Sequence, residues 1–145
     1  MAMNVTKNWP LGGALEDSAK PKDLEGIIAG MAVKKDASGE LIKAVGAVKE
    51  QAYFALDSQD AFDVIESKRI PYILGNAQVQ TDQFVAGAYV PGDELQVSVT
   101  GGEEGLVKVH LGAGAPTYGW VDAVEVVDGV TMLTINKPIP MGAAS

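Results

Sequence analysis

The chain has 145 residues, no cysteine and a formal net charge of −8 at pH 7. This length suits one domain with a real core and leaves little room for a second. The absence of thiols excludes disulfides and thiolate metal sites from this sequence, and the acidic balance disfavours nucleic acid, whose phosphates would be repelled. Hydrophobic residues make up 47% of the chain but aromatic residues only 6%, so aliphatic side chains must fill the core.

The first 24 residues differ from the rest. Trp9-Pro10 and the Gly-Gly pair that follows interrupt any period, and the leucines are too sparse to form a face. We therefore expect residues 1–24 to form an extended arm and residues 25–145 to form a β domain. Because such an arm cannot bury Trp9 and Leu11 internally, both are expected to contact a neighbouring protein. The opening residues also lack the pattern of a secretory signal, which favours a soluble, cytosolic product.

The next part of the chain predicts a hairpin and one helix. Residues 27–34 and 41–45 are apolar runs, and the sequence Asp-Ala-Ser-Gly at 36–39 has the composition of a tight turn. Residues 58–68 give the only plausible helix, with Ser58 as its N-cap. Residues 70–74 predict a short strand, which Pro71 places at a sheet edge or at a strand start.

From Val79 to Ile135 apolar residues recur at every second position, which is typical of half-buried strands. Turn sequences at 91–93, 101–105 and 128–129 separate these runs. We therefore expect a β meander. Its buried residues should include Val97, Val99, Val107, Val109, Leu133 and Ile135. The predicted fold class is mainly β: a single antiparallel β-barrel or sandwich-like domain with an extended N-terminal arm and at most one short helix.

The sequence contains no recognisable catalytic, metal-binding or cofactor motif, so we expect a protein that is not an enzyme and has no cofactor. His110 is the only histidine, and the alternation places it on the surface of a strand. Residues 112–115 are not followed by the helix that a phosphate loop needs. Tyr118 and Trp120 share one side of a strand, which favours packing in the core or at a subunit interface. An aromatic platform for a glycan is the alternative.

The order of these elements resembles that of the small β-barrel decoration, or cement, proteins on the heads of tailed bacteriophages. The resemblance covers about residues 26–136 and depends on turn order and spacing. It is carried by the strand with Gly30 and Val33, the turn at 36–39, Thr81-Asp82-Gln83-Phe84, the strand entry Pro91-Gly92-Asp93-Glu94-Leu95, the glycine-rich reversal at 102–106, and the closing pair 118–121 and 133–135.

This resemblance implies a structural virion protein that binds the outer surface of the assembled head and stabilises contacts between major capsid protein subunits. It implies manufacture in the host cytoplasm and a place on the capsid surface. The acidic charge and the lack of an apolar stretch of about 20 residues lead us to expect no contact with nucleic acid or membrane. We also expect a homo-oligomer, either a dimer or a trimer. The candidate capsid or subunit contacts are Trp9, Leu11, Tyr118 and Trp120. The alternative function is a non-catalytic β module that recognises glycan or protein on a virion or cell surface.

Overall fold

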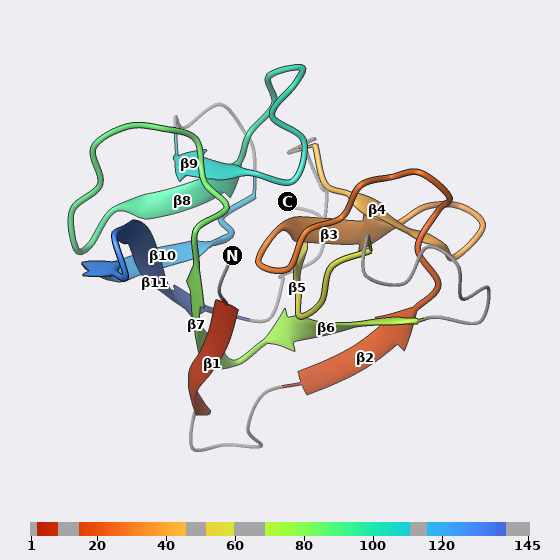
Figure 1. Ribbon diagram of the computed structural model, residues 1–145, viewed down its shortest axis with the longest axis horizontal. Helices are drawn as coiled ribbons and strands as arrows, with labels where there is room; N and C mark the ends of the chain where they lie inside the picture. The colour runs from red at the N-terminus through yellow and green to blue at the C-terminus, as the bar shows by residue number, and fades with distance from the viewer. Residues whose placement is uncertain (1–2, 9–14, 46–51, 60–68, 111–115, 139–145) are drawn as a thin grey trace.

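The computed structural model describes residues 3–8, 15–45, 52–59, 69–110 and 116–138, which form two antiparallel sheets (Figure 1). The strands of the six-stranded sheet are β1 (Met3–Asn8), β7 (Ala77–Thr81), β8 (Glu94–Val97), β9 (Val107–Val109), β10 (Gly119–Val127) and β11 (Val130–Lys137), in the order β1-β7-β11-β10-β8-β9. Those of the five-stranded sheet are β2 (Leu15–Ala19), β3 (Ala32–Lys35), β4 (Leu41–Lys43), β5 (Tyr53–Ala55) and β6 (Ile70–Gly75), in the order β2-β6-β5-β3-β4. The predicted mainly-β, sandwich-like fold is confirmed.

One core cluster joins the two sheets. Its members come from both sheets and include Ala32, Phe54, Ile73, Val79, Leu95, Val97, Val107, Leu133 and Ile135. A second cluster lines the opposite face of the five-stranded sheet and includes Ile27, Val33, Leu41, Ala55, Ile70 and Tyr72. Because successive strand residues point to opposite faces, Phe54 and Ala55 belong to different clusters. The five-stranded sheet is therefore buried on both faces, and the two sheets form one folded unit.

In each sheet, an edge strand is hydrogen-bonded to a segment that follows another strand of that sheet. In the five-stranded sheet, the Leu41 N–H donates to the Lys20 carbonyl at 2.8 Å, and the Lys22 N–H donates to the Leu41 carbonyl at 2.9 Å. In the six-stranded sheet, the Val85 N–H donates to the Val107 carbonyl at 2.9 Å. These bonds cover backbone groups of β4 and β9 that an open sheet edge would expose.

The N-terminal segment is extended, as expected, but it does not form an arm separate from the β domain. Strand β1 pairs with β7, and β2 pairs with β6 (Figure 1). Ala19, at the end of β2, is buried in the second cluster. The reason is that backbone pairing needs no hydrophobic period, so a segment without an apolar face can still complete a sheet. Trp9 and Leu11 lie outside the described residues.

Two of the six residues expected in the core are exposed instead: Val99 is 59% and Val109 is 36% exposed. Val99 lies beyond the end of β8, and Val109 is the last residue of β9, the edge strand of the six-stranded sheet. Strand β10 also pairs with β8 and not with β9, so the simple meander is wrong. Strand β8 therefore lies between β9 and β10 in the sheet.

The first hairpin is confirmed, with a later start than expected. Strands β3 and β4 pair, and the Gly39 N–H donates to the Asp36 carbonyl at 3.0 Å to close the turn. Gly30 precedes β3 and has a φ of +93°, which a regular strand does not contain. Most of the predicted helix, residues 60–68, lies outside the described residues. Ser58 is described, and its hydroxyl oxygen accepts the Ala29 N–H at 2.9 Å.

Candidate binding surface on the six-stranded sheet

The register of the six-stranded sheet brings five side chains into one row on the face opposite the shared core. Gln78 pairs with Asn136, Asn136 with Trp120, and Trp120 with Glu94. The His110 N–H donates to the Glu94 carbonyl at 2.8 Å, which extends the row past the end of β9. We call this set, Gln78, Asn136, Trp120, Glu94 and His110, the Trp120 row. It crosses four strands and the residue after a fifth.

The amide end of the row is held by a chain of hydrogen bonds. The Gln78 Nε2 donates to the Asn136 Oδ1 at 2.9 Å. The Asn136 Nδ2 in turn donates to the Asp122 Oδ1 at 3.3 Å. Asp122 is the extra residue of a bulge in β10, where the register to β11 shifts between Val121 and Ala123. Bulges re-aim a side chain, and this one places a carboxylate beside the row.

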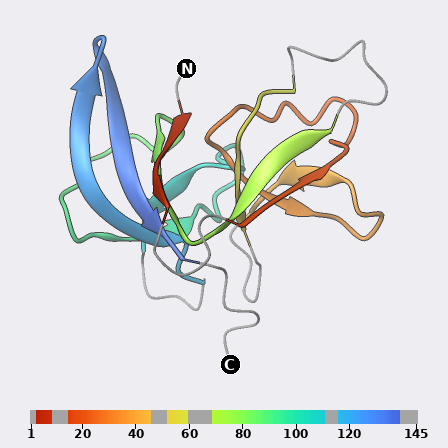
Figure 2. The same cartoon turned by 90° about the horizontal axis from the view of Figure 1, so that it is seen from below.

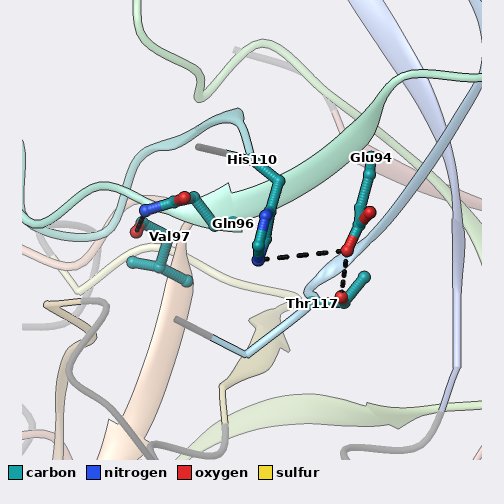
Figure 3. A network of polar contacts seen from close by, with 5 residues as sticks. All are labelled: Glu94, Gln96, Val97, His110 and Thr117. Atoms are coloured by element: carbon teal, nitrogen blue, oxygen red, sulfur yellow. Dashed lines mark hydrogen bonds and ion pairs between the residues drawn. The ribbon is translucent and has the colours of Figure 1, made fainter. Parts of the chain in front are cut away.

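The acidic end of the row is built around Glu94 (Figure 3). Its Oε2 accepts a hydrogen bond from the Thr117 hydroxyl and lies 3.9 Å from the His110 Nε2. The Glu94 side chain is 43% exposed and the His110 side chain 15%. The threonine hydroxyl donates to the carboxylate here, whereas an activated nucleophile would donate to the imidazole. This geometry fits a polar surface that could bind a ligand. It does not fit the nucleophile and base of an acyl-transfer centre.

Tyr118 and Trp120 do not share an exposed face. Tyr118 is 4% exposed and belongs to the core cluster, whereas Trp120 is 42% exposed. Tyr118 precedes β10, so strand alternation does not govern its direction. The two-ring glycan platform is therefore not formed, and Tyr118 is not a surface contact. Of the candidate contact residues that the structure describes, Trp120 alone reaches the surface.

A buried lysine covers the Tyr118 ring. The Lys137 Nζ lies 4.6 Å from the ring centroid and donates to the carbonyls of Leu74, at 3.2 Å, and Pro138, at 3.3 Å. Burial lowers the pKa of Lys137 to about 7 and raises the pKa of Tyr118 above its ordinary value. The Tyr118 hydroxyl has no hydrogen-bond partner in the described part of the chain. Sequence reasoning misses this pair, because nothing in the order of residues shows that Lys137 at the end of β11 is buried.

The β10–β11 hairpin ends in an exposed apolar tip. Val124, Val126, Val127 and Val130 are 38%, 71%, 41% and 44% exposed. We call these four residues the valine tip. Because β8 pairs only with the start of β10 and β7 only with the end of β11, the tip is a two-stranded ribbon. Figure 2 shows this hairpin, in blue, reaching away from the rest of the protein.

The alternation and the bulge divide the valine tip between the two faces of the ribbon. Val124 pairs with Leu133 and so faces the core side, as does Val126. Val127 and Val130 pair with each other on the opposite side. Asp128 and Gly129 close the turn with φ of 51° and 81°, as a two-residue hairpin loop of type I′ requires. The ribbon is thus apolar on both sides of its end.

Comparisons with known proteins identify no relative: no family matches the chain, and no curated protein matches it. Within the described ranges there is no helix long and apolar enough to cross a membrane. The same residues contain no group of three or more histidine, aspartate or glutamate side chains that could hold a metal ion.

Proposed function

We propose that this protein is a decoration protein that binds the outer surface of an assembled phage head and stabilises contacts between major capsid protein subunits. The observation that carries the proposal is the valine tip, an exposed apolar ribbon that projects from a body with a packed core. Isolated exposed valines are ordinary, but four on one hairpin form a surface that gains from being covered. Full burial of a valine stabilises a contact by about 1.5–3 kcal/mol.

The charges around the valine tip define the partner surface. Asp122, Glu125 and Asp128 are exposed on the same hairpin, and residues 121–131 include no lysine or arginine. A partner that covers the valines therefore gains most if it presents an apolar patch with lysine or arginine at its rim. The net charge of −8 on the whole chain disfavours non-specific clustering of the protein before it binds.

The order of turns supports the same assignment. The resemblance to cement proteins is carried in part by the strand entry at 91–95 and by the closing pair 118–121 and 133–135. The strand entry leads into β8, and the closing pair contributes to β10 and β11, the strands that form the hairpin. The valine tip is thus part of the region that resembles those proteins. In this proposal the hairpin attaches to the capsid lattice, and the two-sheet body spans the adjoining surface.

The experiment uses heads assembled without this protein, mixed with the purified chain. We expect many copies to sediment with the heads and to raise the temperature at which the heads release their contents. The variant V126S/V130S should bind about tenfold more weakly or worse, because each loss of 1.4 kcal/mol lowers affinity tenfold. High salt should weaken attachment as well, since screening reduces the attraction of the hairpin carboxylates.

Val99→Ser provides the matched control, because Val99 is similarly exposed but lies after β8, away from the hairpin. This variant should bind heads as the parent does. If the parent chain does not sediment with heads, or leaves their heat resistance unchanged, the proposed function is wrong. If V126S/V130S binds as tightly as Val99→Ser, the valine tip is not the attachment surface.

A further inference from the structure

We propose that the Trp120 row binds a neutral saccharide, with the Trp120 indole under a sugar ring and the polar side chains on either side of it bonded to the hydroxyls. The inference is independent of the proposed attachment to heads. It arises from one juxtaposition: an exposed indole in a sheet register with amides on one side and a carboxylate and imidazole on the other.

The indole supplies the apolar half of such a site. Trp120 is 42% exposed although tryptophan side chains are highly buried on average. The face of an aromatic ring carries partial negative charge, and the C–H groups on one face of a pyranose carry partial positive charge, so the two stack favourably. The sheet beneath Trp120 is rigid, because β10 is paired on both sides at this residue. Binding a ligand at Trp120 should therefore cost little conformational entropy, because the backbone is already ordered.

The flanking groups supply the polar half. Asn136 is fixed between Gln78 and Asp122, and Glu94 is fixed by Thr117. Carboxylates can accept two hydrogen bonds from adjacent hydroxyls, and amides both donate and accept. Strands lie about 4.8 Å apart, so the row from Gln78 to His110 is about 19 Å long. An extended ligand of several sugar rings would follow this row across the strands.

The charge of the row selects against other ligands. Glu94 and Asp122 would repel a phosphate or a carboxylated sugar, and the chain as a whole is strongly acidic. The row is also separate from the valine tip, because Trp120 and Val126 are six residues apart on one strand, or about 20 Å. A saccharide on the row and a protein on the tip can therefore be bound together.

The test uses the full chain carrying Trp9→Phe, which leaves Trp120 as the only tryptophan. The probes are neutral gluco-, galacto-, manno- and N-acetylglucosamine oligosaccharides, titrated while indole fluorescence is recorded. At least one series should shift the emission and saturate, with affinity that rises with oligosaccharide length and does not change between low and high salt. Calorimetry with Trp120→Ala should show about tenfold weaker binding or worse.

Asn136→Ala should weaken the same titration several-fold, because it removes one hydroxyl partner and frees Asp122. Val99→Ser is the control and should leave binding unchanged, and thermal melts verify that each variant is folded. The proposal is overturned if no oligosaccharide binds, or if Trp120→Ala binds as the parent does. It is also overturned if the row prefers a lysine-rich peptide to every sugar and loses it in high salt, which would make the row a basic-protein contact.

Discussion

The Lys137 ammonium lies over the face of the Tyr118 ring, 4.6 Å from its centroid, inside the protein. Both side chains are almost fully buried, at 1% and 4% exposure. The ring face attracts the cation, and the carbonyls of Leu74 and Pro138 accept hydrogen bonds from it. Leu74 is near the end of β6 and Lys137 is the last residue of β11, so the lysine also links the two sheets.

Lys137→Met should change how stability depends on pH. Burial lowers the folded-state pKa of Lys137 to about 7 from an ordinary value of 10.5. Between these values the unfolded chain binds a proton that the folded chain does not, so stability of the parent rises with pH through this window. Below pH 7 the parent carries the full cost of a buried cation. The methionine variant lacks this cost.

We therefore expect Lys137→Met to be more stable than the parent below pH 7, by about 1–4 kcal/mol, with the difference shrinking as pH rises toward 10. Urea unfolding of both proteins across this range measures it. A constant difference between parent and Lys137→Met at every pH would show that the lysine does not titrate as described.

Tyr118→Phe should raise stability. The Tyr118 hydroxyl is buried without a hydrogen-bond partner among the described residues, so its removal ends a desolvation cost of about 1–3 kcal/mol. Tyr89→Phe is the opposite case, because the Tyr89 hydroxyl donates to the Val85 carbonyl, and it should lose about 1 kcal/mol. Thermal melts of the two variants should move in opposite directions. A loss in Tyr118→Phe would mean that the hydroxyl has a partner in solution.

A chain that starts at Asp23 should be strongly destabilised. It lacks β1 and β2 and the backbone bonds of residues 20 and 22 to Leu41. It also lacks the Lys22 carbonyl that accepts the buried Gln59 side-chain amide at 2.8 Å. Circular dichroism should show a broad or much lower melt. Deleting residues 1–2 alone, which precede β1, is the control. An unchanged melting temperature for the longer deletion would show that the prediction is wrong and that residues 1–22 form an arm that does not stabilise the domain.

Gly30→Ala should be costly for two separate reasons. Gly30 has a φ of +93°, and an added Cβ would lie 2.4 Å from the Thr81 Oγ1. That oxygen is itself fixed, since Thr81 donates to the Gly30 carbonyl at 3.0 Å and accepts the Gln83 N–H at 2.9 Å. Gly39→Ala is the matched control, because Gly39 has a φ of +83° but open space around it.

We expect Gly39→Ala to lose about 1 kcal/mol through its backbone alone and Gly30→Ala to lose at least twice as much. The difference in unfolding free energy between the two variants isolates the clash with Thr81. Equal losses would show that Thr81 can move aside without cost.

The sequence predicts a strand well where one face of the strand is buried and the other is exposed to solvent. The run in β7 alternates cleanly between buried and partly exposed residues, and the turn residues Asp128 and Gly129 mark the hairpin between β10 and β11. The sequence does not predict strands that are held by backbone pairing alone and have no hydrophobic pattern. Strands β1 and β2 have no apolar period. They do not need one, because backbone hydrogen bonds to β7 and β6 hold them in the sheets.

The candidate site could be predicted only in part. The sequence predicts Trp120 as a contact residue, but its partners come from other strands, and register between distant strands is not visible in one sequence. Glu94 and His110 are 16 residues apart, and the hydrogen bond from the His110 N–H to the Glu94 carbonyl, next to the paired strands β8 and β9, brings them together. The exposure of Val109 could not be predicted for the same reason. Alternation shows which face of a strand a residue lies on, but it does not show whether another segment covers that face.

Asn76 is the entire connection between β6 and β7, and the residues on either side of it are paired and buried. A hinge requires residues that can absorb a change in backbone angles without losing packed contacts. The connection between β6 and β7 consists of Asn76 alone, so it does not provide such a hinge. Force applied to one sheet must therefore pass directly into the other. The protein should resist bending at the boundary between its two sheets.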